Sequence, residues 1–332
     1  MMLLKPYLLF LGEARDELAA KTAHGVADWR PDWCIGQLRL PGCKADTGLP
    51  DMGVAEAAQK GAKTLVLGIA VSGGRLPESW RQILLEALAH GMDIANGLHT
   101  RLEEIPGISE AAAKHGRKLF NVRHSDQAFD TGKGTRRSGR RLLTVGTDCS
   151  CGKKYTALAL EREMHKRGLK ADFRATGQTG VLIAERGIAI DAVVSDFISG
   201  AAEWLSPANE PDHWDIVEGQ GSLFHPAFAG VSLGLLHGTQ PDRLVMCHEP
   251  TRRHVRGLPG TPIPDVGECI QMNLALAKLT NPDCRMAGVS INTEALGRAE
   301  GERYLKAMAD KHGLPAVDPI AFGVGPLVDR LA

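Results

Sequence analysis

Short apolar runs alternate with amphipathic stretches along the first part of the chain. The run TLVLGIAV at residues 64–71 is apolar on both faces, as in a strand buried within a parallel sheet. The stretch at 77–91 has helical periodicity, with Pro77 near its start and Gly91 just past its end. Strands are predicted at 7–11, 34–38 and 64–71, and helices at 16–27, 54–62 and 77–91. This alternation predicts an α/β layer with right-handed crossovers, although no GxGxxG dinucleotide fingerprint follows the first strand.

A Gly-rich, basic segment without periodicity, Asp126 to Arg141, interrupts this pattern. We interpret it as a solvated linker between domains, with a flap that attracts phosphate as the alternative. The alternation then resumes, with strands predicted at 141–147, 170–176, 214–219, 243–247 and 286–292 and helices at 152–167, 265–279 and 298–312. The sequence therefore predicts a first α/β domain at 1–125, the linker at 126–141, and a second parallel-sheet domain at 142–332.

The composition argues against several classes of protein: nucleic-acid-binding, membrane-bound, disulfide-bonded and zinc-binding. The 332 residues carry 39 basic and 39 acidic side chains, so no overall charge draws the chain to nucleic acid or to a membrane surface. No apolar run approaches a transmembrane length, and the first residues lack a small-residue cleavage site. The seven cysteines show neither a CxxC motif nor zinc-ligand spacing, which predicts reduced thiols. We therefore expect a cytoplasmic protein that holds no metal and, like many α/β enzymes of this size, forms a homodimer.

The stretch LLTVGTDCSCGKKYTALAL, Leu142 to Leu160, is typical of a strand that enters a helix through a glycine-flanked turn. Backbone N–H groups at the start of a helix form an anion site, because they lack partners and the helix dipole is positive there. Two glycines let the chain turn closely around an anion, and a lysine adds a point charge for a terminal phosphate. The predicted phosphate-binding residues are Gly146, Thr147, Asp148, Cys149, Ser150, Cys151, Gly152, Lys153, Lys154 and Tyr155. The alternative is a purely structural turn.

The loop departs from the phosphate-loop pattern GxxxxGK(S/T) at two positions, and these departures bear on whether it binds magnesium. Thr147 stands where the first glycine belongs, and Lys154 stands where Ser or Thr would ligate magnesium. An ammonium group cannot ligate magnesium, and it adds a second positive charge. The loop is therefore predicted to hold phosphates without magnesium-assisted phosphoryl transfer.

A second Gly-rich element lies at residues 213–226, HWDIVEGQGSLFHP. Its apolar strand ends in Glu218, which brings a carboxylate to the carboxyl edge of the sheet, where open α/β sheets bind ligands. A carboxylate there can hold a metal or, without one, act as a general base. The alternative is an ordinary turn in which Glu218 faces solvent.

Together, GTDCSCGKK and DIVEGQGS resemble the dethiobiotin synthetase branch of P-loop proteins, whose pattern is GTDxxxGKT followed by a strand ending in VEGxGG. Further stretches narrow the match: FRATGQTGVLI (173–183), VVSDFISGAAEWL (193–205), CHEPTRRHVRG (247–257), SINTEAL (290–296) and SGGRLPESWRQILLEALAHGMDIANGLH (72–99). Over nearly its whole length the chain resembles a family long catalogued as a domain of unknown function. That family has an N-terminal Rossmann-like domain and a C-terminal P-loop NTPase-like domain. Its functionally assigned branch is of the D-glutamate N-acetyltransferase type.

The resemblance implies transfer of an acetyl group from acetyl-CoA to the amino group of D-glutamate, in D-amino-acid catabolism. Acetyl-CoA carries a pyrophosphate and a 3′-phosphate, which suits a doubly basic loop without a magnesium ligand. N-acetylation also needs a base for the amine, and Glu218 is the candidate, with Asp196 and His225 as rivals.

An acetyl transfer also needs hydrogen-bond donors for the oxyanion that forms on the thioester carbonyl. The loop amides, or the hydroxyls of Thr179 and Ser222, are the candidates. Cys149 offers an alternative, covalent route, since a helix N-terminus favours the thiolate. The other interpretation of Cys149 is a small residue that lines the loop.

The two carboxylates of glutamate call for arginine forks. The motif EPTRRHVRG, just beyond a predicted strand end, offers three arginines, and FRATGQTG adds further polar groups. The candidate substrate-binding residues are Arg174, Gln178, Thr179, Arg252, Arg253 and Arg256. The alternative for each arginine is a solvated surface position or a structural ion pair.

Two other functions stay open at this point. The dethiobiotin synthetase pattern favours an ATP- and magnesium-dependent ligase or kinase, against which Lys154 argues. A module that senses CoA or a nucleotide without catalysis would use the same loop. Residue spacing does not distinguish D-glutamate from L-glutamate or from another amino acid.

Overall fold

The computed structural model describes residues 2–71 and 76–331, and it divides into two compact units. Unit 1 comprises residues 1–127 and 177–192, and unit 2 comprises residues 128–176 and 193–332. The first four residues of the stretch SGGRLPESW, 72–75, lie outside the described part of the chain.

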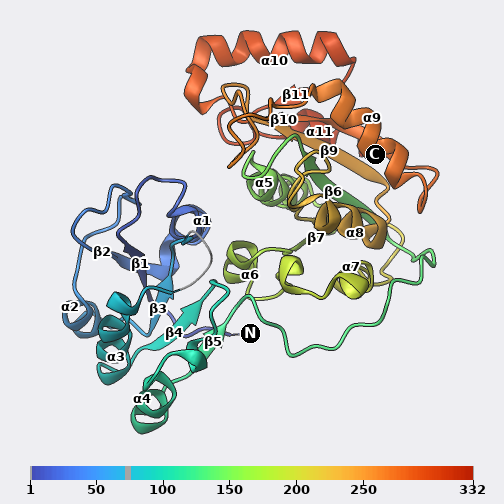
Figure 1. The fold of residues 1–332 in the computed structure, drawn as a ribbon. Helices are drawn as coiled ribbons and strands as arrows, with labels where there is room; N and C mark the ends of the chain where they lie inside the picture. The colour runs from blue at the N-terminus through green and yellow to red at the C-terminus, as the bar shows by residue number, and fades with distance from the viewer. Residues whose placement is uncertain (1, 72–75, 332) are drawn as a thin grey trace. The chain divides into compact units, whose positions relative to one another are not determined.

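Unit 1 contains a parallel sheet of five strands in the order β2-β1-β3-β4-β5 (Figure 1). The strands are β1 (Tyr7–Gly12), β2 (Cys34–Arg39), β3 (Thr64–Leu67), β4 (Asp93–Asn96) and β5 (Leu119–Asn121). Every residue of β1, β3 and β4 is buried, as expected for strands covered by helices on both faces of a parallel sheet. The predicted strand at 64–71 ends early, at Leu67, and the sequence patterns did not identify β4 or β5.

The helices of unit 1 are α1 (Lys21–Trp29), α2 (Val54–Gln59), α3 (Arg81–Ala89), α4 (Ile108–His115) and α6 (Gln178–Ala184). The helix predicted at 16–27 begins later, at Lys21, because Asp16 accepts a hydrogen bond from Ala19 N and closes a turn instead (2.7 Å).

The segment 177–192 leaves unit 2 and returns to unit 1, so the second domain is not the continuous stretch 142–332 that the sequence predicts. Helix α6 buries Val181, Leu182 and Ile183, and it packs on α1. The hydroxyls of Thr179 and Thr22 share a hydrogen bond of 2.9 Å within this contact. The apolar face of α6 therefore completes the core of unit 1.

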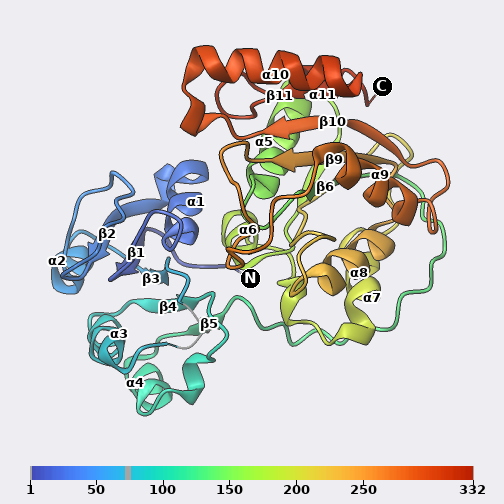
Figure 2. The ribbon, with the colours of Figure 1, turned by 45° about the horizontal axis from the view of Figure 1, so that its top comes forward.

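Unit 2 contains a parallel sheet of six strands in the order β11-β10-β9-β6-β8-β7. Figure 2 labels β6, β9, β10 and β11 of this sheet. The strands are β6 (Arg140–Gly146), β7 (Ala171–Arg174), β8 (Trp214–Val217), β9 (Arg243–His248), β10 (Arg285–Ile291) and β11 (Ala316–Val317). Strand β6 lies between β9 and β8, so the loop that follows β6 reaches the carboxyl edge beside the ends of both neighbours.

The helices of unit 2 are α5 (Lys153–Lys166), α7 (Ile198–Leu205), α8 (Ala229–Thr239), α9 (Val266–Ala277), α10 (Arg298–His312) and α11 (Gly325–Val328). The helices predicted at 152–167, 265–279 and 298–312 are confirmed as α5, α9 and α10. Asp265 caps α9 by accepting from Gly267 N, and Gly313, at φ +62°, ends α10. Helices α7 and α8 and strand β11 were not predicted.

The basic segment 126–141 runs along unit 2 and is anchored there by two arginines. Arg137 donates to the carbonyls of Ser206 (2.9 Å) and Gly238 (2.8 Å), and the nearly buried Arg141 donates to the carbonyl of Ser138 (2.9 Å). These guanidinium groups bind backbone oxygens of their own unit. The segment is thus partly structural, where the sequence indicated a solvated linker.

Within residues 2–71 and 76–331, no helix combines the length and the apolar composition needed to cross a membrane.

Candidate active site

The predicted phosphate loop connects β6 to α5 at the carboxyl edge of the unit 2 sheet. Gly152 turns the chain at φ +104°, and Ser150 adopts φ +52°, a conformation that a residue with a Cβ rarely takes. Position 146 has no room for a side chain, because a Cβ on Gly146 would lie 2.6 Å from Cys151 Sγ. The sequence therefore folds this loop as predicted, directly before the N-terminus of a helix of 14 residues.

Lys153 is folded back onto its own loop. Its side chain is buried, and Nζ donates to the carbonyl oxygen of Asp148 (2.7 Å). The following Lys154 is half-buried, with its ammonium 5.0 Å from the centre of the Tyr155 ring. The ammonium of Lys153 must therefore exchange a backbone carbonyl for a phosphate when an anion enters the loop.

Asp148 fastens the loop to the segment that follows β9. Its carboxylate, 1% exposed, accepts from Cys149 N (2.7 Å), from Arg252 Nη1 (2.7 Å) and from Arg256 N (2.8 Å). Burial lowers the pKa of the Arg252 guanidinium, but the hydrogen bond and the charge of Asp148 outweigh burial and raise that pKa above its ordinary value. A charged pair thus fixes the two chain segments against each other.

Two of the predicted substrate-binding arginines lie against the loop itself. Arg252 also donates to the carbonyls of Cys149 (2.6 Å) and Ser150 (3.2 Å), and Arg256 Nη1 donates to Ser150 Oγ (2.6 Å). Arg253, between them, is exposed. Arg252 and Arg256 therefore shape the loop, and Arg253 is the exposed arginine of the motif.

Glu218 follows β8 and is buried, at 4% exposure, so the interpretation of a solvent-facing turn is wrong. Its Oε2 accepts from the backbone N–H of Thr176, which follows β7 (3.0 Å). Gly219 next to it allows the close approach of β6, because a Cβ there would lie 1.6 Å from the carbonyl oxygen of Thr144 and 3.0 Å from Lys153 Cδ. The turn 218–219 thus lies beside the side chain of Lys153.

His225 is buried, and both of its ring nitrogens have partners. Nε2 lies 3.1 Å from the carbonyl oxygen of Arg256, and the backbone N–H of Ala227 points at Nδ1 (3.2 Å). Because a carbonyl only accepts and a backbone N–H only donates, the neutral ring carries its proton on Nε2.

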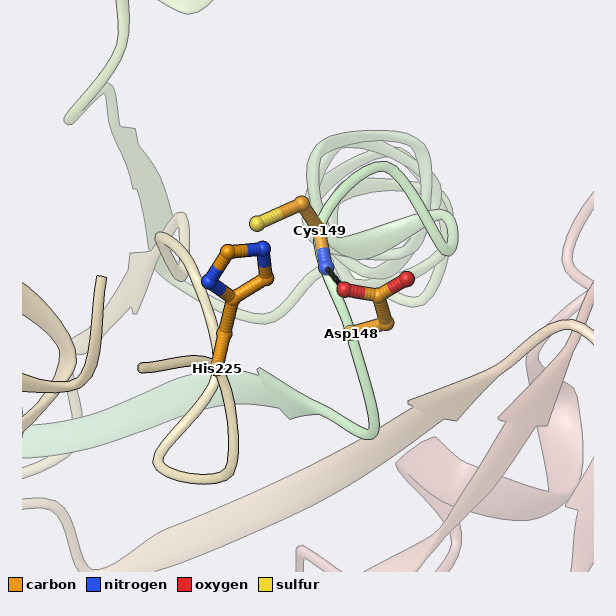
Figure 3. A group of neighbouring side chains, drawn as sticks. All are labelled: Asp148, Cys149 and His225. Carbon is orange, nitrogen blue, oxygen red and sulfur yellow. Dashed lines mark hydrogen bonds between the residues drawn. The ribbon is translucent and has the colours of Figure 1, made fainter. Parts of the chain in front are cut away.

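Side-chain donor atoms of Asp148, Cys149 and His225 all lie within 4.8 Å of one another (Figure 3). Carboxylate, thiolate and imidazole are ligands of transition metals. Here, however, the carboxylate already accepts from a guanidinium and two backbone N–H groups, and Nε2 of the imidazole donates to a carbonyl. The donor set therefore does not fit a metal ion without breaking the Asp148–Arg252 pair.

The remaining predicted site residues have different surroundings, and one of them, Ser222, contacts the loop. Arg174 points back along the sheet, where Nη2 pairs with Asp215 (2.7 Å) and Asp172 (3.3 Å), as the structural-pair alternative expects. Asp196 is exposed in the turn before α7. Gln178 and Thr179 belong to unit 1, and Ser222 Oγ donates to the carbonyl of Thr147 (3.2 Å).

Sequence reasoning missed His248 and Thr176. His248 ends β9, and its Nδ1 lies 3.1 Å from Thr147 Oγ1. Burial lowers the pKa of His248 below its ordinary value and so favours the neutral ring. Both residues end or follow a strand at the carboxyl edge, which is the signal that could have identified them.

Comparison with known proteins agrees with this architecture. Residues 38–125 match a family model described as a domain of unknown function (DUF1611_N), Rossmann-like domain, and residues 128–328 match its partner, a domain of unknown function (DUF1611_C), P-loop domain. The predicted fold class, a Rossmann-like domain followed by a P-loop domain, is confirmed. A crystal structure of a DUF1611 family protein from Anabaena variabilis is 30% identical, with a TM-score of 0.90 and 99% of each chain covered.

Two relatives with an assigned activity match over their full length. The D-glutamate N-acetyltransferase of Tritonibacter scottomollicae is 51% identical over 331 residues, which cover 100% of this chain and 99% of the relative. The D-glutamate N-acetyltransferase of a Pseudoalteromonas species is also 51% identical over 331 residues, with 100% of both chains covered.

Proposed function

The chain belongs to the DUF1611 family, and we propose that it transfers an acetyl group from acetyl-CoA to the amino group of D-glutamate. The two full-length relatives are named D-glutamate N-acetyltransferase, which supports the acceptor and the transferred group. The structural observation that supports it is the loop from Gly146 to Lys154, an anion site at a helix N-terminus with a lysine in place of the magnesium-binding hydroxyl. Such a loop suits a ligand whose phosphates are held and not cleaved.

Binding begins with the phosphates of acetyl-CoA on the loop amides. Lys153 Nζ leaves the Asp148 carbonyl and contacts a phosphate oxygen, so the buried ammonium keeps a partner in both states. Lys154 adds its charge at the rim of the loop. Because Arg252 holds the carbonyls of Cys149 and Ser150, the loop keeps its shape while its lysine moves.

The amine of the acceptor reaches the site as an ammonium ion and must lose a proton before it attacks the thioester carbonyl. Glu218 is the base in this proposal, since its buried carboxylate follows β8 at the carboxyl edge and its turn lies beside Lys153. Asp196, exposed in a turn before α7, is the weaker rival. Exposed Arg253 is assigned to a substrate carboxylate.

The test is thiol release from acetyl-CoA by the purified chain, with a metal chelator present and with D-glutamate and L-glutamate in parallel. The expected result is release with D-glutamate, together with a product that mass spectrometry identifies as N-acetylated glutamate. Tight binding of acetyl-CoA without turnover of any amine would instead favour a sensing module, and ADP formation from ATP and magnesium would favour a ligase or kinase.

Two lysine variants of α5 test the role of the loop in this reaction, one in the loop and one as its control. Lys153→Met removes the buried ammonium of the loop, and we expect acetyl-CoA turnover to fall by about a hundredfold, since a buried charged contact to phosphate is lost. Lys166→Met, at the other end of the helix, removes an ammonium whose side chain is 79% exposed and should leave turnover unchanged. Equal effects of both variants would contradict phosphate binding by the loop.

A further inference from the structure

A hydrogen-bonded network links the candidate base Glu218 to Gln220, a residue with no part in binding phosphate. Thr176, which follows β7 and is completely buried, joins the two. Its backbone N–H donates to Glu218 Oε2 (3.0 Å), and its hydroxyl lies 2.5 Å from the carbonyl oxygen of Glu218. Gln220 Nε2 lies 3.1 Å from the same hydroxyl. One buried threonine of unit 2 therefore contacts both residues.

The chemistry of these groups fixes the orientation of the Gln220 carboxamide. A carbonyl oxygen only accepts hydrogen bonds, so the hydroxyl of Thr176 donates its single proton to Glu218. The oxygen of that hydroxyl can then only accept, and the group of Gln220 that faces it is the donor, the NH2 group. The carboxamide oxygen, Oε1, consequently lies on the side of the carboxamide away from Thr176.

Gln220 Oε1 is open to a ligand. Within residues 2–71 and 76–331, no hydrogen-bond donor contacts it. The backbone of Gln220 is fixed as well, because its carbonyl accepts from Ser232 Oγ on α8 (2.8 Å). Gln220 is half-buried, whereas Glu218 is almost completely buried. A fixed hydrogen-bond acceptor that solvent can reach thus belongs to the same turn as the enclosed carboxylate.

We propose that Gln220 Oε1, held in place by Thr176, accepts a hydrogen bond from the amino group of the acceptor. The proposal rests on the proposed acetyl transfer and names the residue that orients its nucleophile. An ammonium ion has three N–H donors, so it can contact Glu218 and Gln220 at once. One proton passes to Glu218, a second stays in the hydrogen bond to Gln220, and the lone pair that forms attacks the thioester carbonyl.

The experiment is steady-state acetyl transfer by the full-length protein, with acetyl-CoA and D-glutamate varied in turn. A hydrogen bond to a charged group contributes about tenfold or more to affinity, so Gln220→Leu should raise the KM for D-glutamate by at least about that factor. The KM for acetyl-CoA should stay unchanged. Gln271→Leu, which replaces an exposed glutamine on α9 of the same unit, should change neither KM.

Glutarate distinguishes the amino-group contact from a merely structural effect, since it has both carboxylates of glutamate but no amino group. We expect glutarate to compete with D-glutamate and to have the same inhibition constant in the wild type and in Gln220→Leu. If Gln220→Leu raised the inhibition constant of glutarate as much as the KM for D-glutamate, the proposal would be overturned, because the variant would then have damaged the whole acceptor site.

Two variants of Thr176 test its part in the network. Thr176→Val keeps the shape of the side chain but removes the hydroxyl that orients Gln220, so it should raise the KM for D-glutamate as Gln220→Leu does. Thr176→Ser keeps the hydroxyl and should restore the wild-type KM. Because both changes break the same contact, the double variant should show no further rise. Additive effects would show that Thr176 does not act through Gln220.

The outcomes for Gln220 and for the proposed function are distinguishable. If Gln220→Leu leaves the KM for D-glutamate unchanged, the role of Gln220 is wrong and the proposed function stands. If the wild type acetylates no amine, titration calorimetry with D-glutamate separates the two claims. Binding that Gln220→Leu weakens by about tenfold would support the amino-group contact and contradict the proposed transfer. Equal or absent binding in both proteins would contradict both.

Discussion

At the scale of single residues, Asp148 organises the candidate active site. It joins the phosphate loop to the segment after β9 through a charged pair with Arg252 and a hydrogen bond from the backbone N–H of Arg256, and it is almost completely buried. Asp148 and Arg252 are 104 positions apart in the sequence, so no local pattern predicts their contact. The sequence predicts both residues as ligand-binding, and the structure adds that they bind each other.

Replacing Asp148 should lower the stability of unit 2. Asp148→Asn leaves the guanidinium of Arg252 without its carboxylate in a site that is mostly buried, and breaking a buried pair in this way costs about 3 kcal/mol. We expect the free energy of unfolding of unit 2, measured by urea denaturation, to fall by about that amount, with weaker binding of acetyl-CoA.

The control for Asp148 is an exposed pair in unit 1. Asp51 pairs with Arg39, and the side chain of Asp51 is 50% exposed, so Asp51→Asn should change stability by less than about 1 kcal/mol. Equal losses for the two variants would mean that burial of the Asp148–Arg252 pair has no special effect.

At the scale of elements, the strongly patterned segments were predictable and the glycine-rich ones were not. Strands β6 to β10 and helices α5, α9 and α10 follow from apolar runs and helical periodicity. Helix α8, AGVSLGLLHGT, has its glycines four positions apart, and glycine usually indicates a loop. In the structure Gly234 and Gly238 face α7, where a Cβ on Gly238 would lie 2.1 Å from the carbonyl oxygen of Ser199. These glycines allow close helix packing, which only the tertiary structure reveals.

The turn after β8 leaves no room for a side chain at Gly219. Gly219→Ala would place a Cβ 1.6 Å from the backbone oxygen of Thr144, so the end of β8 must shift and carry Glu218 with it. We expect a loss of about 1–3 kcal/mol in stability from the overpacking, together with loss of acetyl transfer because the base is displaced. Thermal unfolding and thiol release measure the two effects.

Gly230→Ala, near the start of α8, is the matched variant for Gly219. Nothing lies within 4 Å of a Cβ built there, and alanine favours a helix over glycine by up to about 1 kcal/mol. Its stability should rise slightly and its activity stay unchanged. A Gly219→Ala protein that is as stable and as active as Gly230→Ala would contradict the role of the turn.

At the scale of the whole molecule, the order of two α/β units was predictable, but their division was not. The alternation of strands and helices predicts two parallel sheets, and both are confirmed. Helix α6 returns to unit 1 because its apolar face completes that core, and sequence order alone assigns it to unit 2. Gln178 and Thr179 lie on α6 and therefore belong to unit 1. The homodimer and the cytoplasmic location stay predictions.

The central claim is that the loop holds the phosphates of CoA without breaking a phosphate bond. Titration calorimetry of the full-length protein with acetyl-CoA, in chelator and again in magnesium, tests it most directly when ATP is titrated in parallel. We predict the same Kd for acetyl-CoA in both conditions and no ADP formed from ATP. Magnesium-dependent ATP hydrolysis, with no binding of acetyl-CoA in chelator, would contradict the claim.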